Sequence, residues 1–291
     1  MIPPRFEYFA PTSVNEAIEL LDRYGGEAKV LAGGQSLLAV MKLRLAEPKA
    51  LVDINRIPNL SYIREEGGWL RIGATTRTND LADSDLVKRR YPILTDAAVE
   101  IADPLVRNRG TVCGNVAHAD PANDLPACML ALGARFVATG PGGNRTIPAD
   151  EFFIDTFVTA LQPSEILTEI QIPEPRPRQG NAYAKLEKRN GDFPIAGVAA
   201  NLVLRADDAI EGAWIGLTSV GPTAIKAREA GDSLIGKRLD DHALKNAARL
   251  AMDVTEPTSD LRGPAEYKRA MVGVLTRRTL HRAAKRARGE S

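Results

Sequence analysis

The chain has 291 residues, of which 44% are hydrophobic and 26% are charged, as is ordinary for a globular protein of about two domains. Its 38 Lys and Arg residues nearly balance its 37 Asp and Glu residues, so the net charge is +1. This balance excludes binding that depends on a strong overall charge, such as sequence-independent attachment to nucleic acid or to an anionic membrane. The composition also excludes the collagen-like, disordered and disulfide-rich classes.

The cysteines and the N-terminal residues narrow the class further. Cys113 and Cys128 form no C-x-x-C pair and have no zinc-type spacing to histidines, and two thiolates cannot hold a four-thiolate iron–sulfur cluster. The first residues lack the basic start and apolar core of a signal peptide, and no run of 18 apolar residues suits a membrane span. We therefore expect a cytoplasmic chain with no metal centre and no transmembrane segment.

The first fifty residues predict an α/β unit. Ser13 and Glu16 have the spacing of a capping box, which starts a helix that a glycine pair ends. A strand at 29–32 follows, then a glycine turn, a helix from Leu37 and a second strand at 51–54.

The rest of the chain predicts a mixture of strands and helices around a proline-rich linker. Three prolines within residues 173–178 indicate an extended, stiff segment, and we place a domain boundary there. Before it we expect, in chain order, a hairpin within 62–72, helices over 79–102 with a break at Pro92, a loop at 103–115, a helix from Asp124, a strand at 134–138, a turn at 140–144 and a strand at 166–172. After it we expect strands at 182–186, 197–204 and 210–217 and helices at 243–254 and 264–286.

Two glycine-bearing loops are the first candidates for a binding site. Gly33 and Gly34 lie between a strand and a helix, where backbone N–H groups not covered by a Cβ suit a phosphate, although the pair would also serve as a simple turn. Residues 110–115 offer glycines, a hydroxyl and an amide within a short stretch. Neither loop is a Walker loop or a G-x-G-x-x-G fingerprint. Together, two such loops in consecutive α/β units would grip one dinucleotide.

No side chain stands out as a catalyst. The chain has no G-x-S-x-G or H-E-x-x-H motif, and His118 near the second loop is either a base or a hydrogen-bonded loop histidine. The basic C-terminal stretch, Arg277 to Arg288, is either a solvated helix whose cations suit its C-terminus or a subunit contact. We therefore expect no catalytic residue on this chain, and a bound cofactor that carries the chemistry.

Three longer motifs give the sequence a specific resemblance. They are AGGQSLL at 32–38, the stretch from IAD at 101–103 to RNRGTVCGN at 107–115, and SDLRGPAEY at 259–267. Together, over residues 6 to about 286, the chain resembles the FAD-binding medium subunits of the molybdenum hydroxylases (the xanthine dehydrogenase family), especially the flavoprotein subunits of aerobic carbon monoxide dehydrogenases.

The resemblance implies an α+β fold. The FAD-binding part is expected to be of the vanillyl-alcohol-oxidase (PCMH) type, with two α/β subdomains at 1–56 and 57–175. A C-terminal domain of the carbon monoxide dehydrogenase flavoprotein kind, with a three-stranded sheet and helices, is expected at 179–288.

The resemblance also implies the site. The FAD diphosphate would lie between two loops, with Asp124 near the ribityl chain and Phe193 over the isoalloxazine ring. The first loop contributes Ala32, Gly33, Gly34, Gln35, Ser36 and Leu37; the second contributes Gly110, Thr111, Cys113, Gly114 and Asn115; and Ile101, Leu161 and Lys185 line the flavin or adenine ends. Two positions depart from the family. Gln35 stands where relatives often have His and can still donate a hydrogen bond, whereas we expect the Cβ of Cys113, in place of a glycine, to crowd the diphosphate or to strain the backbone.

The function implied by the resemblance is electron relay. FAD on this chain would take electrons from [2Fe–2S] clusters on a small partner subunit and pass them to an external acceptor. A large molybdopterin subunit would oxidise the substrate, and the assembly would be a dimer of heterotrimers that binds no nucleic acid. Two alternatives remain open, a stand-alone flavin-dependent reductase and a scaffold subunit that has lost its FAD.

Overall fold

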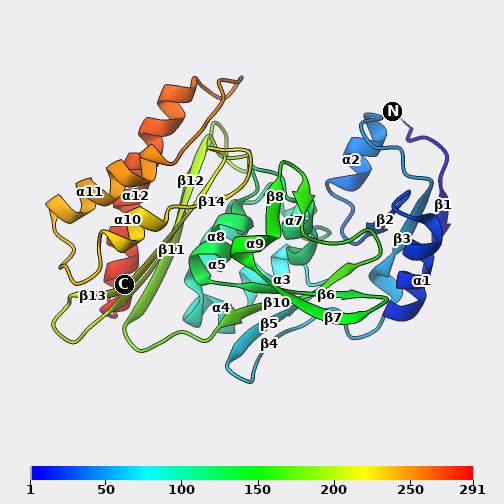
Figure 1. Ribbon diagram of the computed structural model, residues 1–291, viewed down its shortest axis with the longest axis horizontal. Coiled ribbons are helices and arrows are strands. Elements are labelled where there is room, and N and C mark those ends of the chain that lie inside the picture. The colour runs from blue at the N-terminus through cyan, green and yellow to red at the C-terminus, as the bar shows by residue number, and fades with distance from the viewer. Residues whose placement is uncertain (1, 291) are drawn as a thin grey trace.

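The computed structural model describes residues 2–290, and its three larger sheets follow one another along the chain (Figure 1). We call the parts built around them the N-terminal, central and C-terminal lobes. The N-terminal lobe has an all-parallel sheet in the order β1-β3-β2. Its elements are β1 (Glu7–Phe9), α1 (Val14–Tyr24), β2 (Ala28–Leu31), α2 (Leu37–Lys42), β3 (Ala50–Asp53) and the 3₁₀ turn η1 (Ile54–Arg56).

Helix α1 confirms the predicted start at Ser13, with one difference in the cap. The Ser13 hydroxyl accepts a hydrogen bond from the Glu16 N–H at 3.2 Å. The Glu16 carboxylate accepts from the N–H of Thr12 at 2.8 Å, so its bond reaches the residue before the cap. Gly25 ends the helix in the left-handed conformation that glycine adopts without strain.

The central lobe is built on an antiparallel sheet in the order β4-β5-β10-β6-β7. The strands are β4 (Ile63–Glu66), β5 (Trp69–Gly73), β6 (Arg135–Gly140), β7 (Gly143–Pro148) and β10 (Ile166–Pro173), with a separate ribbon of β8 (Phe153–Asp155) and β9 (Val158–Thr159). The helices are α3 (Thr78–Asp83), α4 (Asp85–Arg90), α5 (Pro92–Glu100), α6 (Pro104–Arg107), α7 (Val112–His118), α8 (Asp124–Leu132) and α9 (Ala149–Phe152).

The prediction of a loop over residues 103–115 is wrong, because two short helices lie there. The Asp103 side chain accepts a hydrogen bond from the Val106 N–H at 2.9 Å and caps α6. Thr111 caps α7 in the same way, so His118 lies in the last turn of a helix and not in a loop. Helices this short show no apolar periodicity, and their capping residues are the only indication of them in the sequence. Strand β7 was also missed, since most of it is exposed at a sheet edge.

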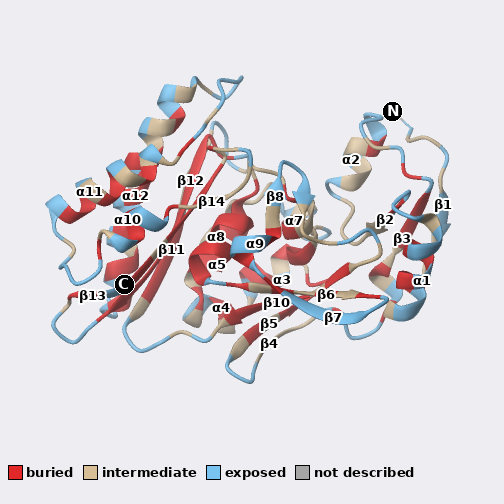
Figure 2. Cartoon of the chain, in the orientation of Figure 1, coloured by how far each residue is buried: buried red, intermediate tan, exposed pale blue. Residues whose placement is uncertain are grey.

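The C-terminal lobe has an antiparallel sheet with three long strands, as expected, and a fourth strand of two residues at its edge. Its elements are β11 (Gln179–Leu186), β12 (Ala196–Leu204), β13 (Ile210–Thr218), β14 (Ile225–Lys226), α10 (Arg228–Asp232), α11 (Asp241–Asp253) and α12 (Ala265–Ala287). Every residue of β12 is buried, because α12 packs on one face of the sheet and α8 of the central lobe on the other (Figure 2).

Candidate cofactor site

The two glycine-bearing loops touch each other. Residues 32–36 connect β2 to α2 in the N-terminal lobe, and a Cβ built on Gly33 would lie 2.4 Å from the carbonyl oxygen of Arg109 and 3.0 Å from the nitrogen of Thr111. Only glycine permits such an approach of two backbones. Gly34 has a φ of +74°, which also favours glycine. The structure therefore brings together the two loops that the sequence analysis paired.

The second loop, which runs from Gly110 into the first turn of α7, is fixed by pairing with residues 76–78 and by the Thr111 cap. The N–H of Thr78 donates to the carbonyl of Gly110 at 2.9 Å, and the N–H of Val112 donates to the carbonyl of Thr76 at 3.0 Å. The Thr111 hydroxyl accepts from the Gly114 N–H at 3.2 Å. A Cβ on Gly114 would lie 2.5 Å from that hydroxyl, so glycine there leaves room for the cap.

Arg77 and Asn55, which the sequence analysis missed, connect the two loops. Arg77 donates from Nη1 to the Arg109 carbonyl at 2.6 Å and from Nη2 to Asn55 Oδ1 at 2.7 Å. Asn55 in turn donates from Nδ2 to the Ala32 carbonyl at 2.7 Å. Burial, together with the neighbouring charge of Arg109, lowers the pKa of Arg77. The only signal in the sequence is that both residues follow shortly after a strand.

Cys113 does not have the strained backbone that we expected from its place in a diglycine motif. It is the second residue of α7 and is absent from the non-glycine residues with positive φ. Its side chain is 2% exposed and points into the core of the central lobe, with Sγ 3.6 Å from the carbonyl oxygen of Gly73. Burial raises the pKa of this thiol. A helical position with an inward side chain needs no glycine.

A buried ionic cluster lies where the central and C-terminal lobes meet. Asp124, the first residue of α8, accepts a hydrogen bond on Oδ1 from the Tyr183 hydroxyl of β11 at 2.5 Å. The same oxygen lies 3.5 Å from Nζ of Lys185, whose side chain is 1% exposed. Lys185 also pairs with Glu187 at 3.0 Å. Tyr183 and Glu187 are further residues that the sequence analysis did not single out.

Two side-chain oxygens, one in this cluster and one on the neighbouring α7, accept no hydrogen bond from residues 2–290. Helix α7 adjoins the cluster because Asn123 donates from Nδ2 to the Asn115 carbonyl at 2.8 Å. Burial raises the pKa of Asp124 to about 6, although Lys185 and the Tyr183 hydroxyl act in the opposite direction. Only Oδ1 of Asp124 is used, and Oδ2 accepts no hydrogen bond from the described residues. Oδ1 of Asn115 on α7 is buried and has no hydrogen-bond partner among residues 2–290. Both oxygens are therefore available to hydroxyl groups of a ligand.

Three of the remaining predicted residues lie around the end of α5. Lys185 donates to the carbonyls of Glu100 at 2.7 Å and of Asp192 at 2.8 Å, which places it between Ile101 and Phe193. Phe193 is 45% exposed. The guanidinium carbon of Arg262 lies 5.5 Å from the centre of its ring. Through its bonds to the two carbonyls, the Lys185 side chain links the end of α5 to β11 and to the loop after it.

Leu161 and three residues of the first loop are less tightly held. Leu161 follows β9 and is half-buried against the core of the central lobe. Gln35 and Ser36 are exposed, and Leu37 at the start of α2 is half-buried. His118 packs against Phe157 with 5.0 Å between ring centroids, and burial lowers the pKa of its imidazole.

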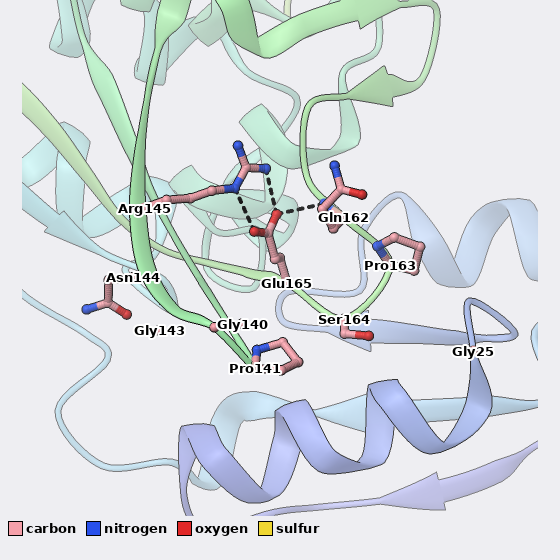
Figure 3. A pocket seen from close by; sticks show the side chains of 11 residues that line it. Gly25, Gly140, Pro141, Gly143, Asn144, Arg145, Gln162, Pro163, Ser164 and Glu165 are labelled. Carbon is pink, nitrogen blue, oxygen red and sulfur yellow. Dashed lines mark hydrogen bonds and ion pairs between the residues drawn. The ribbon is translucent and has the colours of Figure 1, made fainter.

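A cavity of about 490 Å³ lies apart from these residues (Figure 3). It is lined by Gly25, by residues 140–145 at the β6–β7 turn and by residues 162–165, and the Arg145–Glu165 ion pair at 2.6 Å crosses its wall. None of the predicted cofactor residues lines it. Within residues 2–290, no group of three or more His, Cys, Asp or Glu side chains is arranged to hold a metal ion. No helix in that range is both long and apolar enough to cross a membrane.

Comparison with known protein families assigns the class. Residues 4–175 match the family described as the FAD binding domain in molybdopterin dehydrogenase, and residues 181–283 match the CO dehydrogenase flavoprotein C-terminal domain. The chain therefore belongs to the FAD-binding medium subunits of the molybdenum hydroxylases, a class of oxidoreductase flavoproteins.

Within this class the chain is similar to the medium chains of carbon monoxide dehydrogenases. It is 50% identical to that of Hydrogenophaga pseudoflava over 284 residues, covering 97% of this chain and 98% of the relative. It is 44% identical to that of Afipia carboxidovorans over 288 residues, covering 99% and 100%. The solved carbon monoxide dehydrogenase of H. pseudoflava that lacks the Mo-pyranopterin moiety has a TM-score of 0.96 at 49% identity, over 98% of this chain and 99% of that one.

Proposed function

We propose that this chain binds one FAD and connects [2Fe–2S] clusters on a small partner subunit to an external electron acceptor. In the proposed cytoplasmic assembly, a dimer of heterotrimers, a large molybdopterin subunit oxidises the substrate and determines which substrate is used. The observation that carries the proposal is the contact of Gly33 with residues 109–111, which joins two glycine-bearing loops from two lobes.

The residues fit the parts of FAD in turn. The first loop (32–37) offers backbone N–H groups, which suit a diphosphate. In the second (110–115), the N–H groups of Thr111 and Cys113 donate to no residue within 2–290 and could do the same. The free oxygens of Asp124 and Asn115 suit the hydroxyl groups of a ribityl chain. Ile101, Leu161 and Phe193 would supply apolar surface at the ring end.

Charge at the ring end would come from Lys185. A bound flavin would supply electron transfer in one- or two-electron steps. The Lys185 ammonium is buried and held by two backbone carbonyls and by the carboxylates of Asp124 and Glu187. It would therefore contribute a fixed positive charge at the ring end, which these carboxylates partly balance. Phe193 would limit access of water to the same region.

The purified chain should therefore be yellow. Only after the protein is denatured should its flavin pass through a size filter that retains the protein. FAD-free protein should regain the spectrum when FAD is added. A colourless protein that takes up no FAD would support the alternative of a scaffold subunit.

Electron transfer separates the proposal from the second alternative. Co-purified with its molybdopterin and iron–sulfur partners, the chain should show substrate-dependent bleaching of its flavin absorbance, and alone it should not. Multiple turnover by the isolated chain with a nicotinamide donor would instead identify a stand-alone reductase.

A further inference from the structure

Arg77 contacts the second loop directly and the first loop through Asn55. Its two terminal nitrogens donate in different directions, to the Arg109 carbonyl at 2.6 Å and to Asn55 Oδ1 at 2.7 Å. Asn55 completes the connection by donating to the Ala32 carbonyl at 2.7 Å. The Arg77 guanidinium thus binds a carbonyl of the central lobe directly and connects it, through Asn55, to a carbonyl of the N-terminal lobe.

The carbonyl oxygen of Arg109 is also the heavy atom nearest to the place that a Cβ on Gly33 would take. A Cβ on Gly33 would lie 2.4 Å from it, so the position of this oxygen determines how near the two loops come. Arg77 therefore holds the atom at the point of contact. Because the guanidinium fork is rigid, it fixes both acceptors at once, which a flexible ammonium cannot do.

We propose that Arg77 is a positioning residue for FAD, acting through Asn55 and the Arg109 carbonyl to set the gap that receives the diphosphate. This inference rests on the proposed function. Arg77 need not touch the ligand, because both of its terminal nitrogens are directed at protein acceptors. The proximity of Arg77 and Arg109 adds positive charge at the same place, and this contribution has to be separated from the positioning role.

The test is titration of FAD-free protein with FAD, followed by flavin fluorescence. Arg77→Lys keeps the charge but cannot span both acceptors, and we expect its Kd for FAD to rise about tenfold or more, as for the loss of a charge-assisted hydrogen bond. Arg109→Met removes a neighbouring charge and keeps the carbonyl, and its Kd should change by less than about threefold.

Two further measurements distinguish positioning from a general effect on folding. Asn55→Ala breaks the other half of the connection, and the double variant with Arg77→Lys should bind FAD no more weakly than the weaker single variant, because both changes break one path. Ethylguanidinium should restore part of the FAD affinity of Arg77→Ala, and ethylammonium should not. The unfolding midpoints of the FAD-free variants report on the fold separately.

The outcomes are distinct. A wild-type chain that binds no FAD contradicts the proposed function itself. A wild-type chain that binds FAD, with Arg77→Lys binding it equally well or Arg109→Met losing as much affinity, overturns the positioning role. If Arg77→Lys does not fold, Asn55→Ala carries the same test, and unchanged FAD affinity in that variant overturns the role.

Discussion

At the proposed diphosphate end of the site, the lobes meet through backbone atoms, with Gly33 against the carbonyl of Arg109. At the proposed ring end, the central and C-terminal lobes meet through buried ionisable side chains, with Tyr183 and Lys185 around Asp124. The first kind of contact depends on the absence of side chains and is insensitive to pH. The second kind depends on charge and burial, so it should respond to pH and to isosteric substitution. The two ends can therefore be perturbed separately.

The ring end should show the largest effect, through the ionisation of Asp124. Its pKa is about 6 in the folded chain against an ordinary value of 3.8, because burial disfavours the charged form. Between these values the folded chain binds the proton more tightly than the unfolded chain, so the free energy of unfolding falls as pH rises, by about 3 kcal/mol in total. The contribution is largest below pH 3.8 and is lost above about 6.

Asp124→Asn should remove this dependence. Denaturant unfolding of FAD-free protein at pH 4 and pH 7 should show the variant gaining about 2 kcal/mol relative to wild type between the two pH values, because pH 4 already lies just above the ordinary pKa. Asp192→Asn, at an exposed position, should follow the wild-type profile. If the free energy of unfolding changed equally with pH in Asp124→Asn and in wild type, the ring end would not be sensitive to pH through Asp124.

The diphosphate end should respond most strongly to Gly33→Ala. The new Cβ would meet the Arg109 carbonyl at 2.4 Å, which is backbone and cannot rotate away, so the loops must separate. We expect the Kd for FAD to rise about 100-fold, or about 2.7 kcal/mol, as measured by fluorescence titration. Gly142→Ala is the matched control, since no heavy atom lies within 4 Å of its Cβ. Equal affinities for the two variants would contradict the contact.

The same difference explains which parts of the site were predictable. Gly33 and Gly34 were visible because a backbone that must approach another backbone, or take a positive φ, leaves glycine in the sequence. Tyr183 gave no such signal, since a tyrosine in a strand is ordinary and its partner Asp124 lies 59 positions away. Arg77 and Asn55 were missed for the same reason: their connection exists only once the lobes are assembled.

The elements of the fold also differ in whether the sequence predicts them. The capped helix from Ser13, the hairpin within 62–72 and the long strands beyond residue 178 follow from local periodicity and turns, and the structure contains them. The two short helices within 103–115 do not, because they are fixed by single caps and by pairing with residues 76–78. The expected strain at Cys113 was wrong because residue 113 is helical and lacks the positive φ that Gly34 has. Residues 32–34 precede a helix, whereas Cys113 is already inside one.

Cys113→Ala tests whether the side chain at this helical position affects FAD binding. Because the thiol is buried in the core, its removal should lower the free energy of unfolding by about 1–2 kcal/mol. The Kd for FAD should stay within about twofold of wild type, since the side chain points inward. Cys128→Ala, buried in α8, should behave alike in both measurements. An FAD affinity that changes only in Cys113→Ala would show that residue 113 acts on the ligand through its side chain.

The smallest expected effect concerns the N-terminal caps of the helices that follow the two loops. The Thr111 hydroxyl accepts from the Gly114 N–H, whereas Ser36 at the corresponding position before α2 makes no side-chain cap bond. Thr111→Val should therefore lower the free energy of unfolding of the FAD-free chain by about 1 kcal/mol, and Ser36→Ala by less than about 0.5 kcal/mol. Denaturant unfolding of both variants checks this. Equal losses would mean that the Ser36 side chain holds the first loop as the Thr111 cap holds the second.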